Sequence, residues 1–379
     1  MTVKKCDVLI IGGGIIGASI FYELSKYNCS VVLLEKNPVF ADETTKGNSG
    51  VIHGGFDAES QKVEAHLNVL GNSLWQKRIF PKFKFPRAKV DSLVLAFNDE
   101  EMNHAKKLLE RGLTNQVNPN HLKILNRAQV LAHEPNVNPS VLGALLCTNS
   151  FIIDPVAATL ELIEQAKNKN KKFFAHTNTE VTKISFNPKI KNGFSVEFNH
   201  STTIQVKRII NAAGHYADVI AAMAHCPDFR QTTRRGEYRV LDRSQKDIVK
   251  NICFLMPTIH GKGIIVAPML TGHILVGPTA EDNVPKDQTR ITTLAKYNEI
   301  SKIAHKIIPK IDMEQTIMTY AGSRPIDIAT NDFVIGPSRF NPYFINAAGM
   351  QSPGISSAPA IALEIIKHLR KSKLDLVRK

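Results

Sequence analysis

Residues 6–35 constrain the fold of this chain more than any other stretch. An apolar run leads to Gly12-Gly-Gly14-Ile-Ile-Gly17, a helical pattern follows, and a second apolar run ends at Glu35. This order predicts a strand, a tight glycine turn, a helix and a second strand. Gly12 permits the turn, Gly14 lets backbone N–H groups approach a pyrophosphate, and Gly17 lets the helix pack closely on the strand.

Glu35 completes this motif, because it follows the second strand about twenty residues after the turn. A carboxylate at this position accepts hydrogen bonds from ribose hydroxyls, and the phosphates meet the positive end of the helix. A G-x-G-x-x-G pattern alone is weak evidence, since glycine turns are common. With both strands, the helix and Glu35 present, the sequence predicts a binding site for an adenine dinucleotide.

The length and composition indicate a globular protein with more than one domain. The chain has 379 residues, of which 43% are hydrophobic and 22% charged, and this length suggests two domains whose segments can interleave. No apolar run reaches the roughly eighteen residues of a membrane-spanning helix, so we expect no transmembrane segment. The five cysteines are scattered and form no C-x-x-C pair. This fits buried thiols in a reducing cytoplasm and no bound metal.

The chain is basic, with a formal net charge of +14 and a pI near 9.5. Binding to nucleic acid or an anionic membrane, attraction of anionic substrates and compositional drift each account for such a charge. The basic residues form no dense block and no stripe interleaved with aromatic residues. Drift is therefore the favoured interpretation, with steering of an anionic substrate beside it, and we expect no nucleic-acid partner. Peripheral contact with a membrane surface is compatible with the same charge, and the oligomeric state stays open.

Small and hydroxylated residues dominate positions 36–55, a pattern typical of a loop that feeds a short helix with exposed N–H donors. Such a segment suits a second approach to the phosphates of a dinucleotide or to a flavin ring. The expected contacts are Thr44, Thr45, Ser49 and Gly50. His53 is followed by two glycines, which let a ligand come close. A lone loop histidine is usually only solvated, but its place directly after a cofactor loop favours a functional role.

The remainder of the chain alternates between two kinds of pattern. Residues 141–226 contain strands and a helix, and an apolar strand ends in Asn211-Ala-Ala-Gly214 before another helix, which indicates a return to the nucleotide domain. Residues 232–276 show short strands separated by glycine turns, the pattern of an antiparallel sheet. A last strand, a glycine turn and a final helix with Pro353 near its start bring a second helix N-terminus to the cofactor. Lys262 lies in a glycine-flanked turn, where a solvated lysine is the simpler interpretation.

Five short segments are the most specific pieces of the sequence. They are Asn48-Ser-Gly-Val-Ile-His53, Arg234-Arg-Gly-Glu-Tyr238, Pro257-Thr-Ile-His-Gly-Lys262-Gly, Ala321-Gly-Ser-Arg324-Pro and Ser352-Pro-Gly354. Through them the chain resembles the D-amino-acid oxidase-like FAD oxidoreductases over nearly its whole length. Within these it is most similar to the cytoplasmic glycerol-3-phosphate oxidases of mycoplasma type. The resemblance implies an α/β (α+β) fold, in which a Rossmann-like FAD-binding domain is interleaved with a smaller substrate domain built on an antiparallel sheet.

The resemblance also implies a division of the chain and a set of site residues. The expected FAD-binding domain comprises residues 1–82, 141–226 and 317–379, and the expected substrate domain comprises residues 83–140 and 227–316. Beside the motif glycines Gly12, Gly14 and Gly17, the implied FAD contacts are Ile16, Glu35, Thr44, Thr45, Ser49, Gly50, Val51, Val181, Met350, Gln351 and Ser356. The implied substrate contacts are Ser49, His53, Lys262, Arg324 and Ser352. Gln351 departs from the pattern, because close relatives can carry a lysine at this turn. Since the resemblance places this residue beside the flavin, we expect the departure to affect the electronic properties of the cofactor or its rate of reoxidation.

These residues fit the oxidation of a secondary alcohol that carries a phosphate. A flavin accepts the hydride, and His53 is the natural base for the hydroxyl proton because a neutral imidazole titrates near the working pH. A phosphate dianion suits the forked guanidinium of Arg324 and the ammonium of Lys262, with a further hydrogen bond from Ser352. The expected reaction is oxidation of sn-glycerol 3-phosphate to dihydroxyacetone phosphate, with O2 reduced to hydrogen peroxide.

Three alternatives to this reaction remain on sequence grounds. The nearest is an oxidase or dehydrogenase for an L-2-hydroxy acid such as L-2-hydroxyglutarate, which shares His53 and the architecture. An amine oxidase of the glycine or sarcosine kind is disfavoured, because a substrate amine does not demand a histidine at this loop. A basic nucleic-acid-binding protein that keeps only the fold is the alternative outside enzymes. The sequence shows no second nucleotide motif for NAD(P)H and no redox dithiol, which leaves oxygen or a quinone as the electron acceptor.

Overall fold

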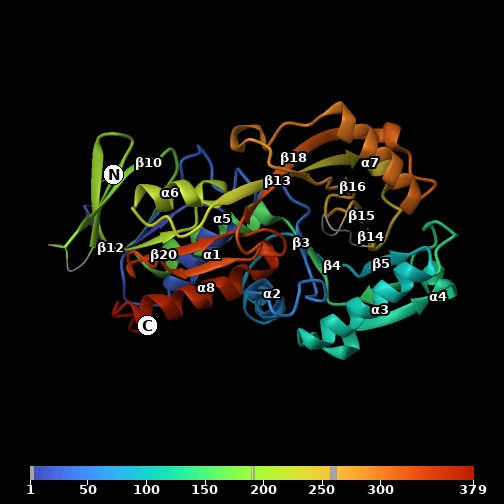
Figure 1. The fold of residues 1–379 in the computed structure, drawn as a ribbon, viewed down its shortest axis with the longest axis horizontal. Coiled ribbons are helices and arrows are strands. Elements are labelled where there is room, and N and C mark those ends of the chain that lie inside the picture. Colours follow the sequence, from blue (N-terminus) through green and yellow to red (C-terminus); the bar gives the residue numbers. More distant parts are fainter. Residues whose placement is uncertain (1–3, 189, 191–192, 257–262) are drawn as a thin grey trace.

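The structure is a computed structural model that describes residues 4–188, 190, 193–256 and 263–379. Figure 1 shows an elongated molecule in which two large sheets lie beside one another. One sheet lies at the end of the molecule that holds both chain termini, and the other forms the opposite end. Residues from both sheets line a common cavity, so the arrangement of the sheets positions the candidate site.

The first sheet is parallel at its centre. β1 pairs in parallel with β2 and β12, β2 pairs in parallel with β9, and β12 pairs in parallel with β20. Antiparallel partners extend the sheet at its margins. The strands are β1 (Lys5–Ile11), β2 (Val31–Leu34), β9 (Phe173–His176), β10 (Val181–Asn187), β11 (Gly193–Phe198), β12 (Thr202–Asn211), β19 (Val334–Pro337) and β20 (Phe344–Ala348). The predicted strand, glycine turn, helix and strand at the N-terminus are confirmed.

Both faces of this sheet are covered, which explains why its strands are continuous apolar runs. Val8 and Ile10 pack into a core with helices α1 (Ile15–Leu24), α5 (Pro155–Lys169) and α8 (Gly354–Lys371). Leu9 and Ile11 point the other way, into a core with α6 (Ala217–Met223) and the β10–β11 hairpin. Because α1 lies between α5 and α8, nine of its ten residues are buried. The cap predicted for α5 is confirmed, since the Asp154 carboxylate accepts the N–H groups of Val156 and Ala157.

The second sheet is almost entirely antiparallel. Its longest strands, β13 and β18, pair along most of their length, and β14 pairs in parallel with β5. Helices α4 (Arg127–His133) and α7 (Leu294–Ile307) pack on one face, and α3 (Asp99–Thr114) packs on the other. The strands are β5 (Ser92–Ala96), β6 (Leu122–Asn126), β7 (Gly143–Cys147), β13 (Gln231–Leu241), β14 (Ile252–Leu255), β15 (Ile265–Pro268), β16 (Ile274–Gly277), β17 (Glu281–Asp282) and β18 (Thr316–Asp327).

A small third sheet and helix α2 join the two large sheets. The small sheet contains β3 (Val51–Ile52), β4 (Arg87–Lys89) and β8 (Phe151–Ile153). Helix α2 (Val63–Leu74) packs against α8 and continues as a short π-helix, Trp75–Ile79. Trp75 is fully buried among phenylalanines, as expected of a core residue.

The segment before β3 differs from the prediction. We expected a short helix after the loop that follows Glu35, but residues 40–46 form successive turns. The N–H groups of Lys46 and Gly47 both bond to the carbonyl of Glu43, and the backbone of Gly47 lies directly against Gly322 of β18. This close backbone contact with β18 favours turns over a regular helix in the segment.

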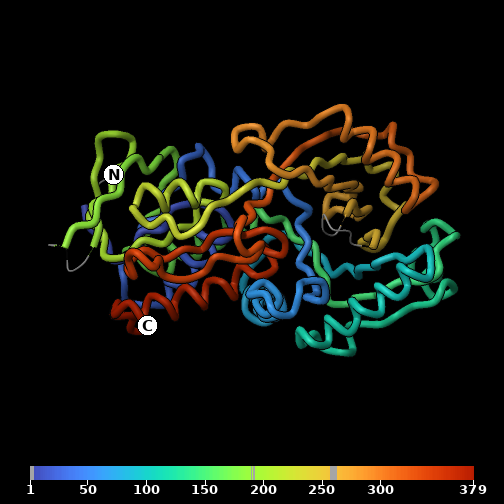
Figure 2. Tube along the Cα trace, viewed as in Figure 1, coloured from blue at the N-terminus to red at the C-terminus, as the bar shows by residue number. Residues whose placement is uncertain are grey.

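The chain passes between the two large sheets several times. Figure 2 shows the tube crossing the middle of the molecule in several colours, from blue to red. β7 belongs to the second sheet, and so does β18, although the expected FAD-binding segments were residues 141–226 and 317–379. We propose that the two domains follow sheet membership, with both strands assigned to the substrate domain. The expected division into five segments otherwise stays a prediction.

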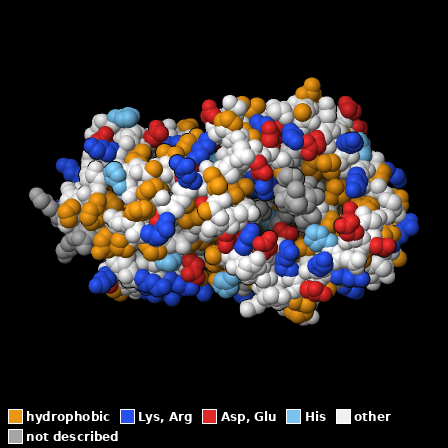
Figure 3. Space-filling model, in the orientation of Figure 1, with side chains coloured by type: hydrophobic (Ala, Val, Ile, Leu, Met, Phe, Trp, Pro, Cys, Tyr) orange, Lys and Arg blue, Asp and Glu red, His pale blue; other side chains and the backbone are white. Residues whose placement is uncertain are grey.

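The surface carries charges of both signs. Figure 3 shows Lys and Arg side chains gathered along the edge where α8 and the C-terminus lie, whereas acidic and basic side chains mix elsewhere on this face. Within the described ranges no helix is long and apolar enough to cross a membrane, and no three metal-ligating side chains come together. All five cysteines are buried and free, and burial raises the pKa of thiols such as Cys29, to about 12.

Candidate active site

The glycine turn between β1 and α1 forms one end of the cavity. Gly12 has a φ of +111°, and a Cβ atom there would overlap the carbonyl oxygen of Ala212 on β12. A Cβ atom on Gly17 would overlap the carbonyl oxygen of Gly12, so the helix approaches the turn as closely as predicted. Gly14 holds the N-cap position of α1 and has no side chain to cover the first turn. The helix N-terminus is therefore open to a ligand's phosphates.

Glu35 lies directly after β2, beside the same turn. Its carboxylate accepts the N–H groups of Gly13, at 2.8 Å, and Asn37, at 2.9 Å. Burial raises the pKa of Glu35, although these two N–H groups oppose the change. The backbone fixes this carboxylate at the edge of the cavity, where the predicted ribose contact requires it.

The turns at residues 42–50 form the long side of the cavity. Thr45 Oγ1 accepts the N–H of Ile15 at 3.0 Å, which ties the segment to the N-terminus of α1. Asn48 donates from Nδ2 to the carbonyl of Thr44 at 3.0 Å and accepts the N–H of Gly50 at 2.6 Å. The sequence indicated contacts here, but not that side chains of the segment would hold its own backbone.

His215 was not among the predicted site residues, yet it joins this segment to the second sheet. Its Nε2 lies 3.0 Å from the carbonyl oxygen of Ser323 and 3.1 Å from Thr44 Oγ1, and Thr44 also donates to Ser323 at 2.8 Å. A carbonyl oxygen only accepts, so the proton of the ring is on Nε2. Nδ1 is buried and has no partner among the described residues. Burial lowers the pKa of His215 to about 4, so the ring is neutral at pH 7.

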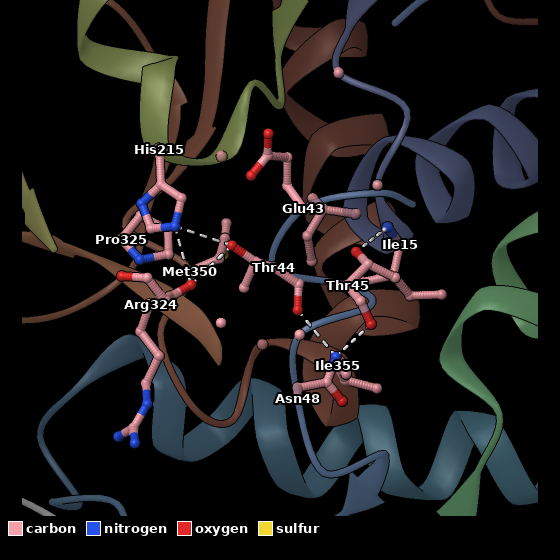
Figure 4. Close-up of a pocket in the computed structure, with 18 of the residues that line it drawn as sticks. Ile15, Glu43, Thr44, Thr45, Asn48, His215, Arg324, Pro325, Met350 and Ile355 are labelled. Carbon is pink, nitrogen blue, oxygen red and sulfur yellow. Dashed lines mark hydrogen bonds between the residues drawn. The ribbon is translucent and has the colours of Figure 1, made fainter. Parts of the chain in front are cut away.

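Figure 4 shows how these groups lie. Thr44 lies between His215 and Thr45, and dashed lines mark the bonds to the histidine ring. The guanidinium of Arg324 points away from this cluster. His215 follows the small residues Asn211-Ala-Ala-Gly214 at the end of β12, and this position was the only signal in the sequence that could have identified it.

His53 follows β3 and is held by its backbone. Its N–H donates to Ser356 Oγ at 2.8 Å, and its carbonyl accepts Asn72 Nδ2 at 3.0 Å. Its ring lies 6.1 Å from that of Phe254, between centroids, and its Nε2 is 3.5 Å from Ser352 Oγ. Both serines belong to the segment that starts α8, so the two ends of the sequence meet at this histidine.

Gln351 and Arg324 complete the polar part of the lining. The amide of Gln351 donates to the carbonyl of Asn331 at 2.9 Å and lies 3.4 Å from Glu64 Oε2, so its nitrogen is engaged with neighbouring protein groups. Arg324 is partly buried on β18, and burial lowers its pKa. No described residue accepts a hydrogen bond from the guanidinium of Arg324, which leaves its donors available to an anion.

Most of the predicted residues line one cavity, with a volume of about 300 Å³. Three do not: Gly17 lies behind the turn within α1, Gly50 lines an adjoining cavity across the same segment, and Lys262 lies outside the described residues. The predicted residues that line the cavity are Gly12, Gly14, Ile16, Glu35, Thr44, Thr45, Ser49, Val51, His53, Val181, Arg324, Met350, Gln351, Ser352 and Ser356. The prediction missed His215 and Tyr238, which also line it.

The cavity fits an extended dinucleotide that carries a flavin. It runs from the glycine turn and Glu35, past the turns at residues 42–50, to His53 and the start of α8. A second helix N-terminus, that of α8, lies at its far end. These features define a nucleotide-dependent oxidoreductase of the class that binds its cofactor between a parallel sheet and an antiparallel substrate sheet.

The comparisons with known proteins agree with this class. The family model described as FAD dependent oxidoreductase, DAO, matches residues 7–367. A glycerol 3-phosphate oxidase of Mycoplasma genitalium is 44% identical over 377 residues, which cover 98% of this chain and 97% of that protein. An L-2-hydroxyglutarate dehydrogenase of Arabidopsis thaliana is 24% identical over 405 residues, covering 96% of this chain and 83% of that protein.

The solved structures give the same result. A dithionite-reduced L-alpha-glycerophosphate oxidase of Mycoplasma pneumoniae with FAD bound superimposes with a TM-score of 0.95 and 42% identity, covering 100% of this chain and 97% of that one. The chain belongs to the DAO family of FAD-dependent oxidoreductases, and its cofactor is FAD. The predicted fold, a parallel FAD-binding sheet with a mostly antiparallel substrate sheet, is confirmed.

Proposed function

We propose that this chain oxidises sn-glycerol 3-phosphate to dihydroxyacetone phosphate and passes the electrons to O2, which forms hydrogen peroxide. The likeness to glycerol 3-phosphate oxidases over nearly the whole chain, at 44% identity, carries this proposal. The site supports it, because a histidine and a serine line the same cavity as an arginine whose guanidinium has no hydrogen-bond acceptor in the described part of the chain.

The residues that hold FAD follow from the shape of the cavity. The turn at Gly12 and Gly14 and the N-terminus of α1 receive the phosphates, and Glu35 lies where a ribose would be. The turns at residues 42–50 and the start of α8 enclose the flavin end. FAD, when bound, accepts a hydride from the carbon atom that carries the substrate hydroxyl.

His53 acts as the base that removes the hydroxyl proton. An imidazole titrates near neutral pH, and Nε2 of His53 faces the cavity beside Ser352 Oγ. The bonds from the His53 backbone to Ser356 and Asn72 fix the point from which the ring projects into the cavity. Ser352 shares a hydrogen bond with the same hydroxyl and keeps it in line with the ring.

Arg324 binds the phosphate of the substrate. Its guanidinium offers forked donors that match phosphate oxygens, and no described residue accepts a hydrogen bond from it, although the Asp282 carboxylate interacts with its charge. Lys262 is the second cation that the sequence predicts for this anion. The neighbouring substrate class, a 2-hydroxy acid such as L-2-hydroxyglutarate, also places an anion near a hydroxyl, which is why the relatives of that name are the second candidate function.

Anaerobic reduction of the flavin tests the reaction. Glycerol 3-phosphate should bleach the flavin absorbance of the purified protein, and admission of air should restore it with formation of hydrogen peroxide. Bleaching with slow recovery would indicate a dehydrogenase that uses another acceptor. Bleaching by L-2-hydroxyglutarate but not by glycerol 3-phosphate would overturn the proposal in favour of the second candidate.

The five free, buried cysteines support the cytoplasm as the compartment of the reaction.

A further inference from the structure

Tyr238 is a polar side chain of the cavity to which the resemblance gave no role. It lies on β13, in register with Tyr320 of β18, while Arg234 of β13 is in register with Arg324. Residues two or four positions apart on a strand share a face, and paired residues of antiparallel strands point to the same side. Tyr238 and Arg324 therefore project from the same face of the second sheet into the same cavity, separated by the pair Gly236 and Gly322.

The ring of Tyr238 is fixed on two sides. It stacks on Tyr320 with centroids 4.7 Å apart and an interplanar angle of 13°, and Tyr320 is anchored by its hydroxyl, which donates to the carbonyl of Asn48 at 2.9 Å. On another side the backbone of Gly277 approaches so closely that a Cβ there would lie 2.8 Å from Cδ1 of Tyr238. The orientation of the Tyr238 hydroxyl is thus set by packing before any ligand binds.

The Tyr238 hydroxyl can donate a hydrogen bond, and the described part of the chain offers it no acceptor. The residue is 5% exposed, and no described residue forms a hydrogen bond with its hydroxyl. Burial raises the pKa of Tyr238 to about 12, so the phenol keeps its proton at neutral pH. Arg324, on the same face, also has no described acceptor. A buried phenol and a partly buried guanidinium on one face of the sheet, both without a described acceptor, can together hold an anion.

We propose that Tyr238 donates a hydrogen bond to a phosphate oxygen of the substrate and, with Arg324, selects phosphorylated alcohols over uncharged ones. This inference rests on the proposed function, because it assigns a further contact to the same substrate. His53 and Ser352 line the same cavity outside the second sheet and are assigned to the reacting hydroxyl, so we assign the side chains of the second sheet to the phosphate end of the substrate.

Two tyrosine-to-phenylalanine variants of the holoenzyme test the inference. Tyr238→Phe removes the hydroxyl in the cavity, and Tyr320→Phe is the matched control, because it removes a hydroxyl from the same stacked pair whose partner is a backbone carbonyl. We expect Tyr238→Phe to raise the glycerol 3-phosphate concentration needed for half-maximal flavin reduction about 10- to 100-fold, the value of a hydrogen bond to a charged group. The limiting rate should change less than about twofold, since the reacting hydroxyl is held elsewhere. Tyr320→Phe keeps the ring on which Tyr238 stacks and the Tyr238 hydroxyl itself, so it should raise the half-saturating concentration less than Tyr238→Phe does.

Inhibition by inorganic phosphate separates binding of the phosphate from binding of the rest of the substrate. Its inhibition constant should rise in Tyr238→Phe by the same factor as the half-saturating concentration and rise less in Tyr320→Phe. Equal effects of the two variants, or a fall in limiting rate without a change in half-saturation, would overturn the inference. Wild-type enzyme that glycerol 3-phosphate does not reduce would instead contradict the proposed function, so the two failures are distinguishable. Retention of the flavin spectrum in both variants reports that each has folded.

Discussion

The two walls of the cavity present different kinds of polar group to a ligand. The wall formed by the first sheet presents backbone groups: the turn at Gly12, the N-terminus of α1, and a carboxylate fixed by two N–H groups. The wall formed by the second sheet presents side chains, Arg324 and Tyr238, whose polar atoms have no partners among the described residues. In the first wall protein N–H groups hold the Glu35 carboxylate, and the N-terminus of α1 stays open to phosphates. In the second wall the available donors belong to side chains, which is what selection of a substrate requires.

The largest effect is expected from a substitution at Gly12, where the first wall has no room for a side chain. Gly12→Ala should abolish retention of FAD, because the new Cβ overlaps the Ala212 carbonyl and φ is +111°. Gly272→Ala is a matched control: it also has a positive φ, +82°, but its nearest neighbour is a side-chain atom of Arg243 at 3.9 Å. That variant should lose only about 1 kcal/mol of unfolding free energy. Flavin absorbance after gel filtration measures the first, and denaturant unfolding the second. If Gly12→Ala bound FAD at the wild-type level, the turn at Gly12 would have room for a side chain and this account would be wrong.

His53 lies where the walls meet, and its replacement should affect chemistry alone. His53→Asn should keep FAD bound, because the backbone bonds to Ser356 and Asn72 do not involve the ring. Flavin reduction by glycerol 3-phosphate should slow about 10²- to 10⁴-fold, the usual contribution of a general base. Stopped-flow absorbance under anaerobic conditions measures this rate. An unchanged rate would remove His53 as the base.

On the second wall, replacement of Arg324 should increase the stability of the protein and weaken the binding of substrate. Arg324→Met removes a buried cation that has no described partner, so the unfolding free energy of the substrate-free holoenzyme should rise by about 1 kcal/mol. The same change should raise the apparent KM for glycerol 3-phosphate about 100-fold. Thermal unfolding and steady-state kinetics measure the two effects. A variant that loses both stability and affinity would show that Arg324 is structural.

The last effect depends on pH and concerns His215, which joins the walls. Its pKa is about 4 in the folded protein against 6.5 ordinarily, so the unfolded chain takes up a proton first as the pH falls. The folded state should therefore lose stability between pH 6.5 and about 4, by roughly 3 kcal/mol in total, and none above this window. His215→Gln, whose amide can still donate to Ser323, should lose less stability over the same window. Denaturant unfolding at several pH values compares the two proteins, and identical slopes would contradict the assignment.

The two walls also differ in how far the sequence could predict them. The first wall was predicted almost completely, because Gly12, Gly14 and Glu35 act at fixed spacings within one stretch of chain. Tyr238 and His215 were not assigned roles, because their surroundings come from strands far apart in sequence, and only the register of β13 with β18 shows which side chains share a face. The short helix expected before β3 was wrong for the same reason, since the backbone contact between Gly47 and Gly322 is invisible locally.

The interleaved chain has a consequence for biosynthesis. The cofactor sheet contains both β1 and β20, which are far apart in sequence, and Met350 and Ser356 line the cavity together with the turn at Gly12. A nascent chain therefore lacks part of the lining until the segment with Met350 and Ser356 has been synthesised. FAD that needs the whole lining cannot guide the folding of the segments that are made before it.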